Sequence, residues 1–184
     1  PNDLVLLFVG SGFERKGLSC FLKGVAWALS RHPKIPLKLI VAGKGNPRPY
    51  LSLAHTLDLH ERVRFVGAWA TIEELYAAAD AFVLPTLYDS FANVTLEAAA
   101  AGLPVLTSRQ NGASELIEDG RSGLIVNDPV DFSEMGERLL EFFDVGWRRV
   151  LGGAAREMAV QFPVSRYAQG TIQVYQAILE EKSW

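Results

Sequence analysis

The sequence predicts an α/β protein in which a parallel sheet carries helices on both faces and is followed by further helices. Short apolar runs of strand length alternate with amphipathic stretches of helical length as far as Asp131. The runs are apolar on both faces, which is typical of strands that are covered from both sides. Beyond Asp131 only helical patterns follow. Alternation of this kind requires right-handed crossovers and produces a doubly wound sheet.

Each predicted strand ends in a loop that leads to a predicted helix. The expected strands are 4–9, 37–42, 63–66, 81–84, 105–107 and 124–126. The expected helices between them are 18–31, 48–58, 71–79, 93–101 and 113–118. Gly102 and Pro104 mark the end of the fourth helix and the approach to the next strand. We therefore expect one Rossmann-like domain over residues 1–184, with C-terminal helices after the sheet.

Composition is that of a globular domain with no polyanionic partner. With 49% hydrophobic residues, 21% charged residues and a formal net charge of -3, the chain does not resemble a nucleic-acid-binding protein. Its single cysteine, Cys20, excludes an internal disulfide framework and agrees with a reducing compartment, so we expect a cytoplasmic protein. No apolar run approaches the roughly 20 residues of a membrane span. The start, PNDLVLLFVG, lacks a signal-peptide pattern and opens almost directly in a strand, so we expect a piece of a longer protein.

In doubly wound sheets, ligands bind outside the carboxyl ends of the strands, so the loops there are the first places to search. The loop after the first strand, GSGFERKG, holds Gly12 and places Arg15 and Lys16 just before a helix, where they could reach a phosphate. It completes neither the dinucleotide fingerprint nor a P-loop. The alternative is a glycine-rich turn with solvated basic residues.

The loop after the second strand, AGKGNPRP, is equally ambiguous. Lys44 could help to hold a phosphate, but a solvated loop lysine is the simpler interpretation.

The stretch YDSFANVTLEAAAAGLPV, which follows the fourth strand, is more informative. The helix predicted to start near Asn93 would point free backbone amides, from Phe91 to Val94 and including Ala92, at an anion. Asp89 precedes these amides and Glu97 follows them by about one turn. Carboxylates accept hydrogen bonds from sugar diols, and amides donate to phosphates. A nucleotide diphosphate sugar has that layout, because its diphosphate lies between a hexose and a ribose.

The alternative is that Asp89 sits in a turn and that Glu97 is an ordinary exposed helix residue. Glu97 is, however, the only charged residue from Val94 to Leu106. Its neighbours are small or apolar and predict a buried segment, in which a lone acid needs a partner. Ser90 is predicted to be a loop donor or a helix cap, because no nucleophile elbow surrounds it.

The chain resembles the C-terminal, nucleotide-sugar-binding half of the retaining group 1 glycosyltransferases, one half of a GT-B fold. The family pattern is an acid, seven residues and a glutamate, then a small-residue helix and G-x-P-V; here Asp89 and Glu97 frame SFANVTL before AAAAGLPV. The likeness extends through VRFVGAW, ELYAAADAFVLPT, NGASELIEDGRSGLIV and FPVSRYAQGTIQVY. GSGFERKG is most similar to the lipopolysaccharide core glucosyltransferase branch. The family usually has a glutamate where this chain has Asp89.

The resemblance implies a role for each position. The amides around Phe91 to Val94 would bind the diphosphate, Glu97 the ribose and Asp89 the hydroxyls of the transferred sugar. Arg15 and Lys16 would neutralise charge on the leaving diphosphate, so no metal cofactor is expected. Gly67 and its loop would lie near the nucleobase, and Asn111 with Gly112 near the sugar or its phosphate.

Metal sites are not expected from the residues either. The sequence has no D-x-D pair, and His32, His55 and His60 are scattered without partners at ligand spacing.

The resemblance also implies what this chain lacks. In the family, the acceptor site belongs mainly to an N-terminal domain, so we expect that this chain alone is inactive. The donor is expected to be a UDP-sugar and the acceptor a saccharide or lipid-linked saccharide, with retention of configuration and with the full protein at the inner face of the cytoplasmic membrane. Two alternatives remain: a nucleotide-sugar 2-epimerase of the same fold, and a noncatalytic nucleotide-sugar-binding module.

Overall fold

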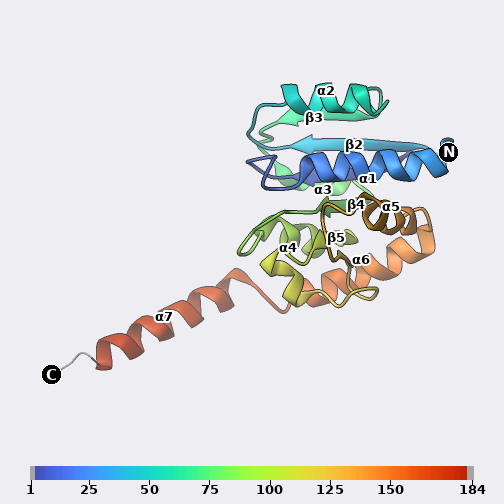
Figure 1. Ribbon diagram of the computed structural model, residues 1–184. Coiled ribbons are helices and arrows are strands. Elements are labelled where there is room, and N and C mark those ends of the chain that lie inside the picture. Colours follow the sequence, from blue (N-terminus) through green and yellow to red (C-terminus); the bar gives the residue numbers. More distant parts are fainter. Residues whose placement is uncertain (1–2, 182–184) are drawn as a thin grey trace.

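The computed structural model describes residues 3–181 and contains a six-stranded, all-parallel sheet (Figure 1). Its strands are β1 (Leu4–Val9), β2 (Leu37–Ala42), β3 (Val63–Gly67), β4 (Ala81–Leu84), β5 (Val105–Ser108) and β6 (Leu124–Val126). They are ordered β3-β2-β1-β4-β5-β6, so the sheet grows outward in both directions from the central pair β1 and β4. The predicted Rossmann-like α/β fold is confirmed, with β3 and β5 each one residue longer than expected.

Helices cover the sheet on both sides. They are α1 (Leu18–Arg31), α2 (Arg48–Thr56), α3 (Ile72–Ala78), α4 (Asn93–Ala100), α5 (Phe132–Glu141), α6 (Val145–Ala159) and α7 (Val164–Glu181). Helix α1 packs against α2 and α5, whereas α4 packs against α6. Strands β4, β5 and β6 are wholly buried and β1 nearly so, whereas the edge strand β3 has no buried residue. Large core side chains such as Phe8, Phe21, Phe82 and Phe142 are fully enclosed. The helices therefore account for the two-sided apolar character of the strands.

The helix predicted over 113–118 is present as a 3₁₀ helix, shifted by one or two residues. The chain forms a single 3₁₀ segment there, η1 (Gly112–Leu116). Its amides bond three residues back, from Ser114 to Asn111 and from Ile117 to Ser114. Ile117 is already extended, so the segment cannot continue into α-helical bonding.

The strand order places two loops beside each other at the centre of the sheet. The chain leaves β1 towards β2 and β3 on one side, and it leaves β4 towards β5 and β6 on the other. In open parallel sheets, the crevice at such a switch point is where ligands bind. The loops that follow β1 and β4 therefore define the region in which to search for a site.

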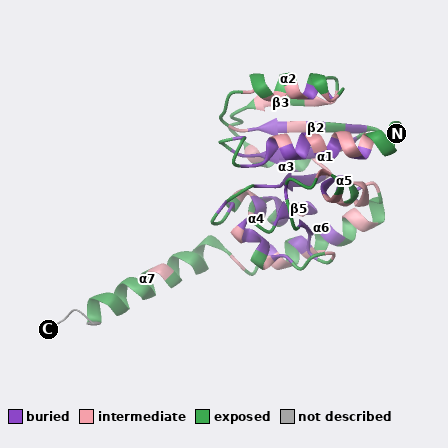
Figure 2. Ribbon diagram, viewed as in Figure 1, coloured by how far each residue is buried: buried purple, intermediate pink, exposed green. Residues whose placement is uncertain are grey.

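Helix α7 extends away from the rest of the domain (Figure 1), and Figure 2 shows it almost entirely exposed. The aromatic side chains of Tyr167 and Tyr175 on this helix are exposed by 77% and 64%. Trp184 lies outside the described residues. The apolar side chains of α7 thus have no cover among residues 3–181 of this chain.

Two glycines provide a matched test of how tightly the loop after β1 is held. Gly12 and Gly17 both have left-handed backbones, with φ of 74° and 76°. A Cβ at Gly17 would lie 1.9 Å from the Pro85 carbonyl oxygen, whereas a Cβ at Gly12 would meet nothing within 4 Å. Gly12→Ala should cost about 1–2 kcal/mol of unfolding free energy through backbone strain alone. Gly17→Ala adds a clash and should cost roughly 3 kcal/mol or more.

Urea unfolding of both variants measures this difference. Equal losses would show that the loop after β1 can move away from Pro85.

Candidate functional site

The loops after β1 and β4 are tied together at the switch point. The backbone carbonyl of Arg15 accepts the amide of Leu87 at 2.8 Å and the hydroxyl of Thr86 at 2.9 Å. Both donors belong to the segment that follows β4. Since β1 and β4 are neighbours in the sheet, these bonds hold the loop after β1 against the loop after β4.

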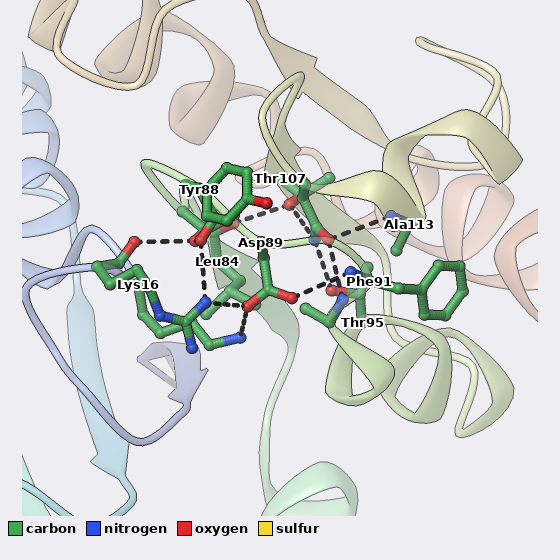
Figure 3. A network of polar contacts seen from close by, with 12 residues as sticks. Lys16, Leu84, Tyr88, Asp89, Phe91, Thr95, Thr107 and Ala113 are labelled. Carbon is green, nitrogen blue, oxygen red and sulfur yellow. Dashed lines mark hydrogen bonds and ion pairs between the residues drawn. The ribbon is translucent and has the colours of Figure 1, made fainter.

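Asp89 is the centre of a charged cluster between these loops (Figure 3). Its Oδ2 accepts hydrogen bonds from Arg15 Nη1 at 2.5 Å and from Lys16 Nζ at 2.6 Å. Its Oδ1 accepts the backbone amide of Phe91 at 3.1 Å. Arg15 also donates to the Tyr88 carbonyl at 2.9 Å. The structure thus brings together the three residues for which the sequence predicts catalytic roles.

The cluster keeps Asp89 ionised. Burial alone would raise the pKa of this carboxyl, but hydrogen bonds from Lys16 and then Arg15, together with their charges, hold the pKa below its usual value. Two cations face one carboxylate, so the cluster carries one surplus positive charge. The Lys16 side chain is 9% exposed and that of Arg15 is 51% exposed. Arg15 is therefore the cation that can reach a ligand without leaving a buried position.

The start of α4 has free backbone amides, but fewer than the four that were predicted from Phe91 to Val94. The amides of Phe91 and Ala92 are already bonded, to Asp89 Oδ1 and Asn111 Oδ1, so the prediction that they are free was wrong. Within the described chain, the next two amides, those of Asn93 and Val94, donate no hydrogen bond. Ala92, at the N-cap position, has no side chain that could cap them. The helix start therefore presents two free donors and a positive dipole end.

Asn111 is the buried support of this helix start. Its side chain is fully buried, and its Oδ1 accepts the amides of Ala92 and Ala113. Its Nδ2 donates to the hydroxyls of Thr95 and Thr107. These bonds use the full donor capacity of the amide, so its side chain positions the loop and is not free to hold a sugar.

Gly112 was predicted, with Asn111, to lie near the sugar or its phosphate. In the structure it allows η1 to pack closely against the loop after β4. A Cβ there would lie 1.8 Å from the Ser90 carbonyl oxygen, so only glycine lets η1 approach the loop after β4. Its amide donates to the Asp89 carbonyl at 2.9 Å. Gly112 thus fixes the backbone of Asp89.

Glu97 lies on the surface, and the expectation that it is buried was wrong. The helical period gives the reason, because Ala98 and Ala99 face the core while Glu97 shares the outer face with Asn93, one turn earlier. The predicted need for a partner is met by Tyr76 of α3, whose hydroxyl donates to Glu97 Oε2 at 3.0 Å. Sequence reasoning assigned no role to Tyr76. The sequence feature that could have indicated a role is its position in ELYAAAD, directly before a buried strand.

The remaining predicted donor residues lie in loops or at a strand end along the same edge of the sheet. Lys44 is exposed, and its carbonyl accepts the amide of Gly12 at 3.3 Å, so the loops after β1 and β2 touch. Gly67 ends β3, and nothing lies within 4 Å of a Cβ placed there. Ser90 is exposed. Contacts between these residues and a nucleotide sugar stay a prediction.

Among residues 3–181, no three histidine, cysteine, aspartate or glutamate side chains are grouped so that they could hold a metal ion. None of the helices in that range is long and apolar enough to pass through a membrane.

The fold and the cluster define a doubly wound α/β domain with an anion-attracting site at its switch point. The family model of the group 1 glycosyl transferases matches residues 3–142. The chain therefore belongs to the group 1 glycosyltransferase family, and its solved structural neighbours are GT-B glycosyltransferases.

Similar proteins span several glycosyltransferases. The chain is 34% identical to D-inositol 3-phosphate glycosyltransferase 2 of Catenulispora acidiphila, over 98% of this chain and 45% of that protein. It is 34% identical to the lipopolysaccharide glucosyltransferase WaaG of Escherichia coli, over 73% of this chain and 36% of WaaG. The crystal structure of WaaG superposes with a TM-score of 0.81 at 31% identity, over 88% of this chain and 44% of that one.

The fold recurs in more distant structures. HepE from Anabaena, in complex with UDP and glucose, has a TM-score of 0.83 at 23% identity, over 95% of this chain and 48% of HepE. The chain spans less than half the length of each of these relatives.

Replacing Asn111 tests its supporting role. Asn111→Ala removes the acceptor of two buried amides and the donor to two buried hydroxyls, so the unfolding free energy should fall by about 3–5 kcal/mol. The matched control is Gln110→Ala, because Gln110 is exposed and makes one side-chain bond, to the Asn127 carbonyl at 3.2 Å. That control should change stability by less than about 0.5 kcal/mol. Chemical denaturation of both variants gives the values, and similar losses would contradict the assigned role.

The Asp89 cluster predicts a pH dependence of stability. The pKa of Asp89 is lowered in the folded state from the ordinary 3.8, so its contribution is fully present above that value. The contribution is lost as the pH falls through the lower, folded-state pKa. Unfolding free energies measured from pH 7 to pH 3 should therefore fall more steeply for the wild type than for Asp89→Asn. Parallel curves would mean that the cluster does not stabilise the fold.

Proposed function

We propose that this chain is the donor-binding half of a retaining hexosyltransferase that takes its hexose from a UDP-sugar without a metal ion. The observation that carries the proposal is the Asp89 cluster. It combines one surplus positive charge with the free amides of Asn93 and Val94, and Glu97 lies one turn further along the same helix face. A ligand with an anionic centre between two hydroxyl-bearing ends matches that order.

The diphosphate would be held by Arg15 and the start of α4. The exposed guanidinium of Arg15 offers N–H groups in a planar fork that suits phosphate oxygens. The amides of Asn93 and Val94 add donors at the positive end of the helix dipole. Because these groups are in place before reaction, they stabilise charge that grows on the leaving diphosphate. This role is the one that a divalent cation plays in metal-dependent transferases.

Binding of the donor would change the hydrogen-bond partners of Arg15 and Asp89. Asp89 Oδ2 accepts from both Arg15 and Lys16 in the unliganded protein. When Arg15 turns to the phosphates, Asp89 keeps buried Lys16 and gains accepting capacity for hexose hydroxyls. Lys16 stays near the diphosphate as a fixed positive charge. Glu97, on the outer face of α4, would accept the ribose hydroxyls.

The acceptor would be a saccharide or a lipid-linked saccharide that binds to an N-terminal domain outside this chain. The likeness to a lipopolysaccharide glucosyltransferase supports a hexose donor and an acceptor of that class. The full protein would act in the cytoplasm, at the inner face of the cytoplasmic membrane. This chain by itself would bind the donor without turnover.

Calorimetric titration tests the donor site. The ligands are UDP, UDP-glucose, GDP-mannose and ADP-glucose, each without metal and then with magnesium. We expect UDP to bind without metal and UDP-glucose to bind more tightly. Glu97→Ala should weaken UDP about tenfold, and Asp89→Ala should abolish the increment due to glucose.

Glu157→Ala, which removes an exposed acid of α6, is the control and should leave binding unchanged. A dependence on magnesium would contradict the metal-free site. Failure of all four ligands to bind would contradict the donor site itself.

Product analysis of the full-length protein tests the reaction. A sugar transferred with its anomeric configuration retained is the expected result. Release of a free epimer would identify a 2-epimerase instead. Binding of the nucleotide sugar without turnover by the full-length protein would identify a noncatalytic module.

A further inference from the structure

We propose that Tyr76 is a positioning residue that orients Glu97 towards the ribose hydroxyls of the donor. The inference rests on the proposed function, in which Glu97 binds the ribose. The observation behind it is the hydrogen bond from the Tyr76 hydroxyl to Glu97 Oε2, at 3.0 Å, which joins α3 to α4.

The two partners differ in how firmly they are held. Tyr76 is only 5% exposed, and its ring meets Phe82 of β4 edge-on, with centroids 6.4 Å apart. Glu97 is exposed on the outer face of α4. A rigid, buried phenol thus presents a hydroxyl at a fixed point to a side chain that would otherwise sample several rotamers.

The bond leaves Glu97 able to bind a ligand. An ionised carboxylate has about four lone-pair positions, and Tyr76 occupies one of them. Among the described residues, nothing donates a hydrogen bond to Oε1. The carboxylate is therefore oriented through one oxygen and open at the other. Ordering the side chain before the ligand arrives reduces the entropy lost on binding.

Tyr76 is the donor of this hydrogen bond and Glu97 is the acceptor. Burial raises the pKa of the Tyr76 hydroxyl, and the adjacent Glu97 charge and the hydrogen bond raise it further. The phenol thus stays protonated and can always donate. Glu97, as a carboxylate, can only accept.

A simpler role for the bond is that Glu97 satisfies a buried hydroxyl and nothing more. The two roles differ in one measurable respect. If Tyr76 orients Glu97 for the ribose, removing the hydroxyl matters only when the ligand has ribose hydroxyls. If the bond only satisfies Tyr76, its loss affects stability and leaves that discrimination unchanged.

The test is calorimetry of the wild type and Tyr76→Phe with UDP and with its 2′,3′-dideoxy analogue. ADP and GDP are titrated in the same way, each together with its 2′,3′-dideoxy analogue. For the nucleotide that binds, Tyr76→Phe should weaken the ribose form about fivefold and leave the dideoxy form unchanged. In a Glu97→Ala background, Tyr76→Phe should have no further effect on either form. Tyr167→Phe, which removes an exposed phenol hydroxyl from α7, is the matched control.

Equal weakening of both forms by Tyr76→Phe, or no weakening of either, would overturn the inference. A crystal structure of Tyr76→Phe is the second measurement; it should show Glu97 in more than one rotamer, and one unchanged rotamer would also contradict the inference.

Failure of the proposed function is recognised separately. In that case the wild type binds the ribose and dideoxy forms equally, or it binds no nucleotide. Either result would also contradict the positioning role of Tyr76.

Discussion

The sharing of one Asp89 oxygen by two cations is the interaction on which the rest of the site depends. Lys16 is buried, and a buried ammonium without a partner is expensive, so the loop after β1 can adopt its path only because Asp89 faces it. The same carboxylate bonds the Phe91 amide and so sets the chain direction into α4. One acid therefore joins the loop after β1 to the helix after β4.

At the start of α4, some backbone amides are bonded within the protein and others are free. Asn111 draws the Ala92 amide inward and holds Thr95 of the first helical turn. The next amides, of Asn93 and Val94, have no hydrogen-bond partner among residues 3–181. Asp89 and Asn111 are bonded within the protein, so they shape the site from inside. Arg15, Asn93 and Glu97 are exposed and are the groups that meet solvent.

The charged cluster and α7 are two separate features of a chain that matches part of each relative. The chain belongs to the group 1 glycosyltransferases and spans less than half of the relatives that it matches. Its charged cluster lies at the carboxyl edge of a single sheet, and α7 extends away with its apolar side chains exposed. Tyr76 links α3 to the exposed face of α4, so α3 also bears on the position of the Glu97 carboxylate.

The sequence by itself determined the six strands, most of the helices and the loops that carry the site, because apolar periodicity and glycine placement are local properties. It also predicted Arg15, Lys16, Asp89 and Glu97 as site residues, and the structure brings the first three of them together. It did not determine that one Asp89 oxygen binds both cations, that the amides of Phe91 and Ala92 are occupied, or that Glu97 is exposed beside Tyr76. Residues 15 and 89 meet only because β4 pairs with β1, and strand order is decided by contacts far apart in sequence, which no local pattern records.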